Sequence, residues 1–275
     1  MGADTAAETM DSIAWYQRFV VPLVTSRFFP RWEGLEDDPA LWSLFDERLE
    51  DTWSRFAPEG PLPEVWGWKY CETAFVMPLV AKAFPGARFV HVVRDGRDVA
   101  SSRAGYFQVT GPPGDPPGWD PPPLRAEERP EGDPSPRASY MSFCLAIAFD
   151  DPAATRWRDV DLSDPAERAR NRFRLQMKAW VNSVERARRY GAASPERYVE
   201  VRYEDLCLAP AETGRELLAR LELPFTHAAE RFLDDGVHSR RVGRWKSARL
   251  SRAEEDDLAR AAEWGRPALR AFGYG

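Results

Sequence analysis

Apolar residues recur at every third or fourth position in several segments, which is the pattern of amphipathic helices. This spacing predicts helices over 38–57, 73–84, about 165–190 and 211–223. We expect Pro78 to kink the second of these helices and Gly191 to lie just past the end of the third. One stripe of the third helix should face the core, formed by Phe173, Met177, Trp180 and Val184.

Short runs of β-branched and aromatic residues alternate with these helices. They predict strands over 65–69, 88–93 and 197–203. A helix should start at Asp95 or Gly96 directly after the second strand, and a last helix at Ser251, where Glu254 completes a capping box. This alternation indicates an α/β fold with a mainly parallel sheet.

The length allows one large domain or at most two small ones, and we expect one. The chain has 275 residues, of which 43% are hydrophobic, so residues 1–275 can bury one substantial core as a single domain. The segment 111–136 carries ten of the 24 prolines and few apolar residues. We therefore expect a loop there, either mobile or ordered on binding, rather than a domain boundary.

Charge and cysteine usage exclude several classes of protein. The net charge of −6 argues against a protein whose whole surface binds nucleic acid or an anionic membrane, but it allows a local basic pocket. Cys71, Cys144 and Cys207 lie far apart without a CxxC pair, which suits a reducing, cytoplasmic environment. The N-terminus lacks the pattern of a signal peptide, and no apolar run is long enough to span a membrane.

The stretch HVVRDGRDVASS, residues 91–102, combines a buried strand with a charged turn. Arg94 ends the strand, the next helix turns its N-terminus to the same space, and Ser102 carries a hydroxyl. Arginine, helix N–H groups and serine together can bind a phosphate. On the residues alone, ordinary capping explains the turn equally well, with Asp95 as the cap and Asp98 supporting it or pairing with Arg97.

Four segments resemble the sulfotransferase family, in the order in which that family has them. FPGARFVHVVRDGRDVASS is similar to its 3′-phosphate-binding strand and helix, and VRYEDL to its segment beside the nucleotide. RRVGRWK resembles the late loop that closes over the 3′-phosphate, and WGWK the strand whose lysine approaches the sulfuryl group. The resemblance covers roughly residues 60–275.

The resemblance implies a three-layer sandwich of the P-loop NTPase-like type, a mainly parallel sheet between helices. It also implies transfer of a sulfuryl group from 3′-phosphoadenosine 5′-phosphosulfate to a hydroxyl or amine of a small-molecule or glycan acceptor, without a metal. Lys69 would be the catalytic residue that steadies the sulfuryl group. Residues implied in holding the nucleotide are Arg94, Ser102, Tyr203, Arg240, Arg241 and Gly243.

One expected feature is missing. The family's glycine-rich loop, Pro/Arg-x-Gly-Thr-Thr after the first strand, is absent, and the only early apolar run, 18–29, contains no glycine. Either the chain starts downstream of that first strand and loop, or it is a degenerate member. The alternative function is therefore a non-catalytic protein that binds adenosine 3′,5′-bisphosphate. A third hypothesis is a binder of phosphate backbones that uses the basic run 238–249.

The catalytic base is not assigned by the sequence. Glu72 is one candidate, although a glutamate there also suits the start of a helix. His91 lies inside a strand, where a packed histidine is expected, and His227 and His238 have no partner that the sequence identifies. The acceptor and the oligomeric state also stay open.

Overall fold

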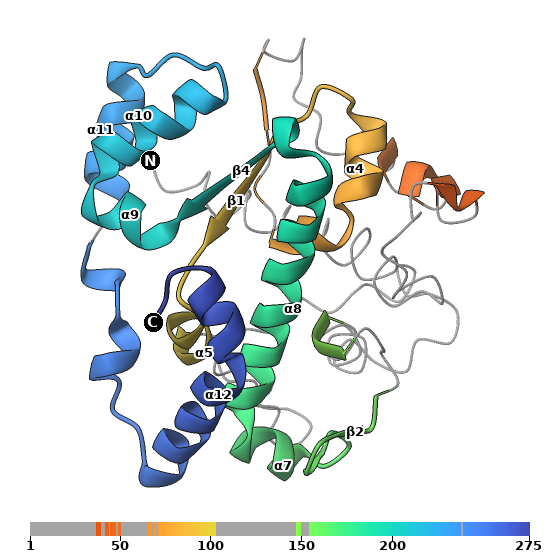
Figure 1. Cartoon of the computed structure of the whole chain (residues 1–275), viewed down its shortest axis with the longest axis vertical. Helices are drawn as coiled ribbons and strands as arrows, with labels where there is room; N and C mark the ends of the chain where they lie inside the picture. Colours follow the sequence, from red (N-terminus) through yellow and green to blue (C-terminus); the bar gives the residue numbers. More distant parts are fainter. Residues whose placement is uncertain are drawn as a thin grey trace, which may run out of the picture. The chain divides into compact units, whose positions relative to one another are not determined.

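The computed structural model describes residues 37–39, 42–43, 45–47, 49–50, 65–67, 69, 71–102, 147–149, 154–237 and 239–275 (Figure 1). The chain divides into two compact units, one of residues 1–85 with 111–154 and one of residues 86–110 with 155–275. A single domain over 1–275 stays a prediction, and the proline-rich segment 111–136 lies outside the described residues.

The described part of the first unit is helical. Helical residues occur within 39–50, as predicted, where Trp42 stacks on Phe45 with ring centres 5.6 Å apart. The 3₁₀-helix η3 (Cys71–Phe75) and the helix α4 (Met77–Ala83) follow.

Two predictions for the first unit are wrong. The single kinked helix over 73–84 is divided at Val76, and Pro78 lies in the first turn of α4, where its missing N–H costs no helical hydrogen bond. The strand over 65–69 is absent, since none of the described residues 65–67 and 69 has strand structure. High β-propensity forms a strand only where a partner strand supplies hydrogen bonds.

A parallel pair of strands lies at the centre of the second unit. β1 (Phe89–Val93) pairs with β4 (Tyr198–Arg202), with Phe89 opposite Tyr198 and Val93 opposite Arg202. Both strands confirm the predictions. α5 (Gly96–Ser102) follows β1 and starts where the sequence places it, and α9 (Tyr203–Leu208) follows β4.

The remaining elements of the second unit extend this arrangement. A short antiparallel hairpin precedes the long helices, and three helical segments and two 3₁₀ turns follow β4. Their bounds are β2 (Arg156–Trp157), β3 (Val160–Asp161), α7 (Pro165–Arg170), α8 (Arg172–Ala193), η5 (Pro195–Arg197), α10 (Pro210–Arg220), α11 (His227–Gly236), η6 (Ser239–Arg241), η7 (Arg244–Ser247) and α12 (Arg252–Ala271).

One face of the β1–β4 pair packs on α8 and on the C-terminal segment. Phe89 meets Tyr190 of α8 at 5.1 Å between ring centres, and His91 meets Phe272 at 6.3 Å. All four predicted stripe residues of α8 are buried. On the other face Val90 and Val92 are 39% and 48% exposed among the described residues. Helices on both faces of the sheet, the three-layer arrangement, therefore stay a prediction.

The long helix predicted near 165–190 is divided in two. α7 and α8 meet at Asn171, and Asp164 caps α7 by accepting the Ala166 N–H. Gly191 was predicted to lie just past the end of this helix, but it lies inside α8. A Cβ atom at Gly191 would lie 2.3 Å from the Tyr198 ring, so this glycine permits close approach of β4 rather than ending the helix.

The two ends of α12 are defined by capping motifs. Ser251 and Glu254 form the predicted capping box. At the other end Gly273 has φ +77°, the left-handed conformation that favours glycine, and the Tyr274 N–H bonds to the Leu269 carbonyl oxygen. This turn sends Tyr274 back to β1. No helix among the described residues is both long and apolar enough to cross a bilayer.

Gly191→Ala should destabilise the protein by about 1–3 kcal/mol, because the methyl group meets the Tyr198 ring, although alanine itself favours a helix. Denaturant unfolding measures this change. Gly86→Ala is the matched control, since nothing lies within 4 Å of a Cβ atom there. A Gly191→Ala variant at least as stable as the parent would show that the close approach is not a packing constraint.

Candidate functional site

The candidate site lies where β1 and β4 end. Neighbouring parallel strands place their carboxyl ends at the same edge of a sheet, which is where ligands bind in α/β proteins. Arg94 follows β1 directly and Tyr203 begins the helix after β4. The Arg94 guanidinium carbon lies 5.1 Å from the centre of the Tyr203 ring. Two side chains that lie far apart in the sequence are thus brought together.

The Arg94 guanidinium is held at one of its nitrogens. Nη2 donates to the Arg241 carbonyl oxygen at 2.7 Å and lies 3.3 Å from Oδ2 of Asp98. Nε is enclosed and has no hydrogen-bond partner among the described residues. The backbone is fixed as well, because the Trp180 indole N–H donates to the Arg94 carbonyl oxygen at 3.0 Å. Arg94 is therefore positioned while part of its donor capacity is unused.

Asp98 joins α5 to the segment 239–247. Its side chain is fully buried, with 0% exposed. Oδ2 accepts the Gly243 N–H at 2.8 Å, and Oδ1 accepts the Trp245 N–H at 2.9 Å. Gly243 has φ +69°, a left-handed turn that an L side chain rarely adopts. The carboxylate thus holds this segment against Arg94.

Asp98 was expected to support the cap or to pair with Arg97, and the pairing with Arg97 is wrong. Arg97 instead forms a two-pronged contact with Asp95, through Nε at 2.9 Å and Nη2 at 2.7 Å. Its guanidinium also lies 4.5 Å from the centre of the Trp245 ring. Asp98 points to the other side of the helix, where buried backbone N–H groups need an acceptor.

Asp95 caps α5, as predicted, by accepting the Arg97 N–H at 2.8 Å. Its own N–H donates to the buried carboxylate of Glu204 at 3.0 Å. The second oxygen of Glu204 lies 2.7 Å from the Tyr274 hydroxyl. Because Asp95 already occupies the helix N-terminus, anion binding at this site depends on the arginine side chains rather than on free helix N–H groups.

The hydroxyl of Tyr203 lies among charged groups. Burial raises its pKa, as do the hydrogen bond and the charge of Cys207, whereas a hydrogen bond from Arg241 and the charge of Arg94 lower it less. The net shift is upward, so the hydroxyl stays protonated at neutral pH and can donate a hydrogen bond. Arg241 is exposed, which leaves its guanidinium open to solvent.

The other predicted nucleotide-binding residues are placed less centrally. Ser102 is exposed on α5, one turn after Asp98, and donates to the Val99 carbonyl oxygen at 3.0 Å. Arg240 is exposed beside Arg241. Lys69 is exposed and belongs to the first unit, so its approach to the sulfuryl group stays a prediction.

The candidate bases have different surroundings. His91 is packed, as expected, with Nδ1 2.5 Å from the Tyr198 hydroxyl and 3.7 Å from Glu200. His227 does have a partner, Glu230, at 3.5 Å on an exposed helix. The Glu72 side chain and His238 lie outside the described residues. Within the part of the chain that the structure describes, no His, Cys, Asp and Glu side chains gather in a group that could hold a metal ion.

Sequence reasoning missed the roles of two groups that shape the site. Trp180 was expected only in the core, yet its indole N–H binds the Arg94 carbonyl oxygen. Glu204 links the Asp95 N–H to Tyr274, a role that its position in the first turn of α9 does not reveal. Long-range contacts of this kind carry no local signal in the sequence.

The comparison with known proteins adds one finding. The profile of the Sulfotransferase family matches residues 7–116 and 149–227, which is more than half of the chain. The matched ranges contain Lys69, Arg94, Ser102 and Tyr203, whereas Arg240, Arg241 and Gly243 lie beyond them. No curated protein and no solved structure matches the chain. The link between Arg241 and Arg94 therefore comes from the geometry alone.

Asp98→Asn should loosen the segment 239–247, because the amide keeps only one acceptor oxygen for the two N–H groups of Gly243 and Trp245. We expect a loss of about 2–4 kcal/mol in unfolding free energy. Amide hydrogen exchange at Gly243 and Trp245 should accelerate in parallel. Asp256→Asn, at an exposed position of α12, is the matched control. Unchanged exchange in Asp98→Asn would contradict the clamp.

Glu200 gives a pH-dependent prediction. Burial raises its pKa, but hydrogen bonds from His91 and Arg188 and the charge of Arg188 outweigh burial and hold the pKa at about 2, below its usual 4.5. A lowered folded-state pKa contributes stability above about pH 4.5 that is lost as the pH falls toward 2. Glu200→Gln should therefore lose less stability than the parent between pH 5 and 2.5.

Urea unfolding at several pH values measures this difference. Glu216→Gln, at an exposed position of α10, should keep the acid dependence of the parent. If Glu200→Gln shows the same acid dependence as the parent, the network around Glu200 does not stabilise the ionised carboxylate.

Proposed function

The chain belongs to the sulfotransferase family, and we propose that it binds the 3′-phosphate of 3′-phosphoadenosine 5′-phosphosulfate between Arg94, Tyr203 and Arg241. The observation that carries the proposal is the convergence of these three side chains at the ends of two parallel strands. A guanidinium group offers planar pairs of N–H donors that match phosphate oxygens.

The charges near Arg94 favour an anion. Two arginines lie there, and Asp98 is buried with both oxygens engaged by N–H groups of the protein. No acidic residue occurs between Asp235 and Glu254, whereas 240–249 contains five basic residues. A phosphate therefore finds a locally positive surface on a chain of negative net charge.

The individual donors have distinct parts in this proposal. The contacts of the Arg94 guanidinium with described protein atoms run through Nη2, and Nε is enclosed, so Nη1 is left for a phosphate oxygen. Arg241 approaches from the solvent side, and Arg240 and Ser102 supplement it. Gly243 supports the site through its left-handed turn, because its N–H is already donated to Asp98.

The reaction that follows is sulfuryl transfer to a hydroxyl or amine of a small-molecule or glycan acceptor. The donor supplies the activated sulfuryl group, and no metal takes part in the scheme. Lys69 would stabilise the charge that develops on the sulfuryl oxygens. The protein would thus contribute mainly by orienting the donor and by fixing positive charge beside it.

A second candidate function is binding of adenosine 3′,5′-bisphosphate without transfer. It is favoured by one property of the sequence, because no glycine occurs between Gly2 and Gly34 and the Pro/Arg-x-Gly-Thr-Thr pattern is absent. That pattern cradles the 5′-phosphosulfate in the family. Release of the bisphosphate from the donor in the presence of phenol, amine and glycan acceptors distinguishes transfer from binding alone.

Calorimetric titration with adenosine 3′,5′-bisphosphate tests the shared part of both candidates. We expect the Kd to rise about tenfold or more in Arg241→Ala and further in Arg94→Ala, because each substitution removes a charge-assisted contact. Arg231→Ala, at an exposed position of α11, should bind like the parent.

Arg241→Ala is the more informative variant, because Arg241 is exposed and its truncation should not disturb folding. Parent-like affinity in both Arg94→Ala and Arg241→Ala, with the fold intact by circular dichroism, would place the bisphosphate elsewhere and refute the proposed site.

A further inference from the structure

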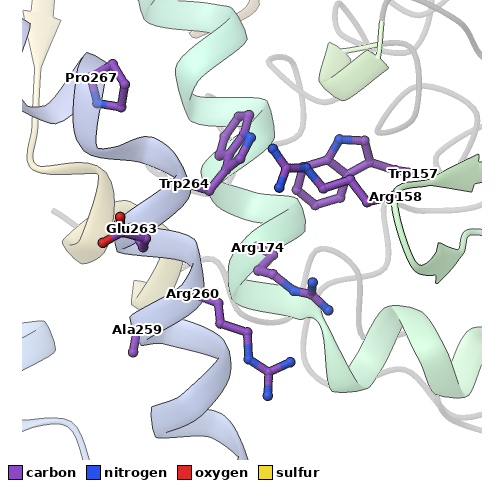
Figure 2. A pocket seen from close by; sticks show the side chains of 8 residues that line it. All are labelled: Trp157, Arg158, Arg174, Ala259, Arg260, Glu263, Trp264 and Pro267. Atoms are coloured by element: carbon purple, nitrogen blue, oxygen red, sulfur yellow. The ribbon is translucent and has the colours of Figure 1, made fainter.

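A pocket lies in the same unit of the protein as the candidate site, and Arg94, Tyr203 and Arg241 do not line it. It has a volume of about 580 Å³, within the range of small-molecule sites (Figure 2). One face of α12, the first turn of α8 and the β2–β3 hairpin form its walls. The side chains that define its chemistry are Trp157, Arg158, Arg174, Arg260, Trp264 and Pro267.

Two tryptophan rings provide the apolar part of this pocket. Trp157 and Trp264 meet edge to face, with ring centres 5.4 Å apart and an angle of 88° between their planes. Trp264 comes from α12 and packs against the main core, whereas Trp157 belongs to the hairpin. Perpendicular rings of this kind form an apolar corner. A further flat ring placed there can stack on the face of one tryptophan and meet the other tryptophan edge to face.

The three arginines of the pocket are not equivalent. Arg174 is neutralised by the protein, with Nε 3.1 Å from Asp257 and Nη1 3.0 Å from Asp159. Arg158 and Arg260 form no ion pair within the described ranges of the chain, and both are exposed. The charge of Arg260 acts on Asp159, whose pKa it helps to lower behind larger contributions from backbone and Arg174 hydrogen bonds.

The other charges near the pocket leave it positive. Glu263 also lines it, but forms an ion pair with Arg266 on the same helix. Lys178 adds a cation, with Nζ 5.7 Å from the centre of the Trp264 ring. Figure 2 shows Trp157, Arg158 and Trp264 gathered at one end of the pocket, with Arg174 and Arg260 toward the other.

The backbone of Arg158 supplies an independent observation. Arg158 is the first residue of the two-residue turn between β2 and β3, and its φ is +53°. Glycine is the usual residue in that conformation, and an arginine there costs about 1–2 kcal/mol. Strain of this kind is tolerated where the side chain has a use, and this arginine lies at the mouth of the tryptophan corner, 5.7 Å from the Trp157 ring centre.

We propose that this pocket binds a small aromatic anion, a flat ring system that carries a sulfonate, sulfate or carboxylate group. The ring enters the corner between Trp157 and Trp264 beside Arg158, and the anionic group extends toward Arg260. Ring contact and charge pairing act together, so neither an uncharged aromatic compound nor inorganic sulfate should bind as well. The inference does not depend on the proposed donor site.

Titration calorimetry with 2-naphthalenesulfonate tests the proposal on the full-length protein. The uncharged isostere naphthalene-2-sulfonamide and inorganic sulfate are the matched ligands, and both should bind at least tenfold more weakly than the sulfonate. Saturation with adenosine 3′,5′-bisphosphate should leave the affinity for the sulfonate unchanged. If the bisphosphate displaces the sulfonate, the anion occupies the Arg94 site and the proposal is wrong.

Three variants locate the site. Arg260→Ala and Trp264→Ala should each weaken sulfonate binding about tenfold or more, while Arg270→Ala, on the same helix but outside the pocket, should not. Arg260 is exposed, so its variant should fold even if Trp264→Ala proves unstable. Parent-like affinity in Arg260→Ala overturns the proposal.

Arg158→Gly separates a ligand-binding role from a structural one. Glycine relieves the left-handed backbone, so the thermal midpoint should rise by about 1–3 °C, while the affinity for the sulfonate should fall. A variant that is more stable and binds as well as the parent would show that Arg158 does not contact the ligand.

Discussion

The buried carboxylate of Asp98 is the constraint on which the candidate site depends. A carboxylate with no solvent exposure must be matched by donors, and here Arg94 and the N–H groups of Gly243 and Trp245 provide them. The pairing is mutual: the same contacts that stabilise Asp98 hold the segment 239–247 beside the end of β1. Arg94 is thereby kept in one position, with its Nη2 group bound inside the protein and its Nη1 group available to an anion. A pre-positioned cation of this kind loses little entropy when it binds an anion.

The C-terminal residues reinforce this arrangement from the opposite side. The left-handed Gly273 turns the chain after α12, so that the Tyr274 hydroxyl lies 3.0 Å from the Val93 carbonyl oxygen and 2.7 Å from Glu204. Glu204 in turn accepts the Asp95 N–H. Both sides of the β1–α5 turn are thus fixed by residues from the last part of the chain. The family profile ends at residue 227, so the segment that completes the site lies outside the matched ranges.

The elements whose signal is local could be predicted from the sequence, and those set by distant contacts could not. The apolar pattern gave β1, β4, the buried stripe of α8 and the capping box at Ser251, because each depends on neighbouring residues. Gly191 was misassigned as a helix end because the Tyr198 ring that requires it approaches from another element. The pairing of Asp98 with Arg97, one of its two expected roles, failed for the same reason, since two of its actual partners lie about 145 residues further along the chain. Sequence therefore identified Arg94, Tyr203 and Arg241 as candidates, but only the fold brings them together.

A crystal structure of the protein with adenosine 3′,5′-bisphosphate tests the central claim most directly. The account predicts oxygens of the 3′-phosphate within about 3 Å of the guanidinium groups of Arg94 and Arg241, with Asp98 still accepting the Gly243 and Trp245 N–H groups. A bisphosphate bound away from Arg94, or bound there only after the segment 239–247 has separated from Asp98, would contradict it.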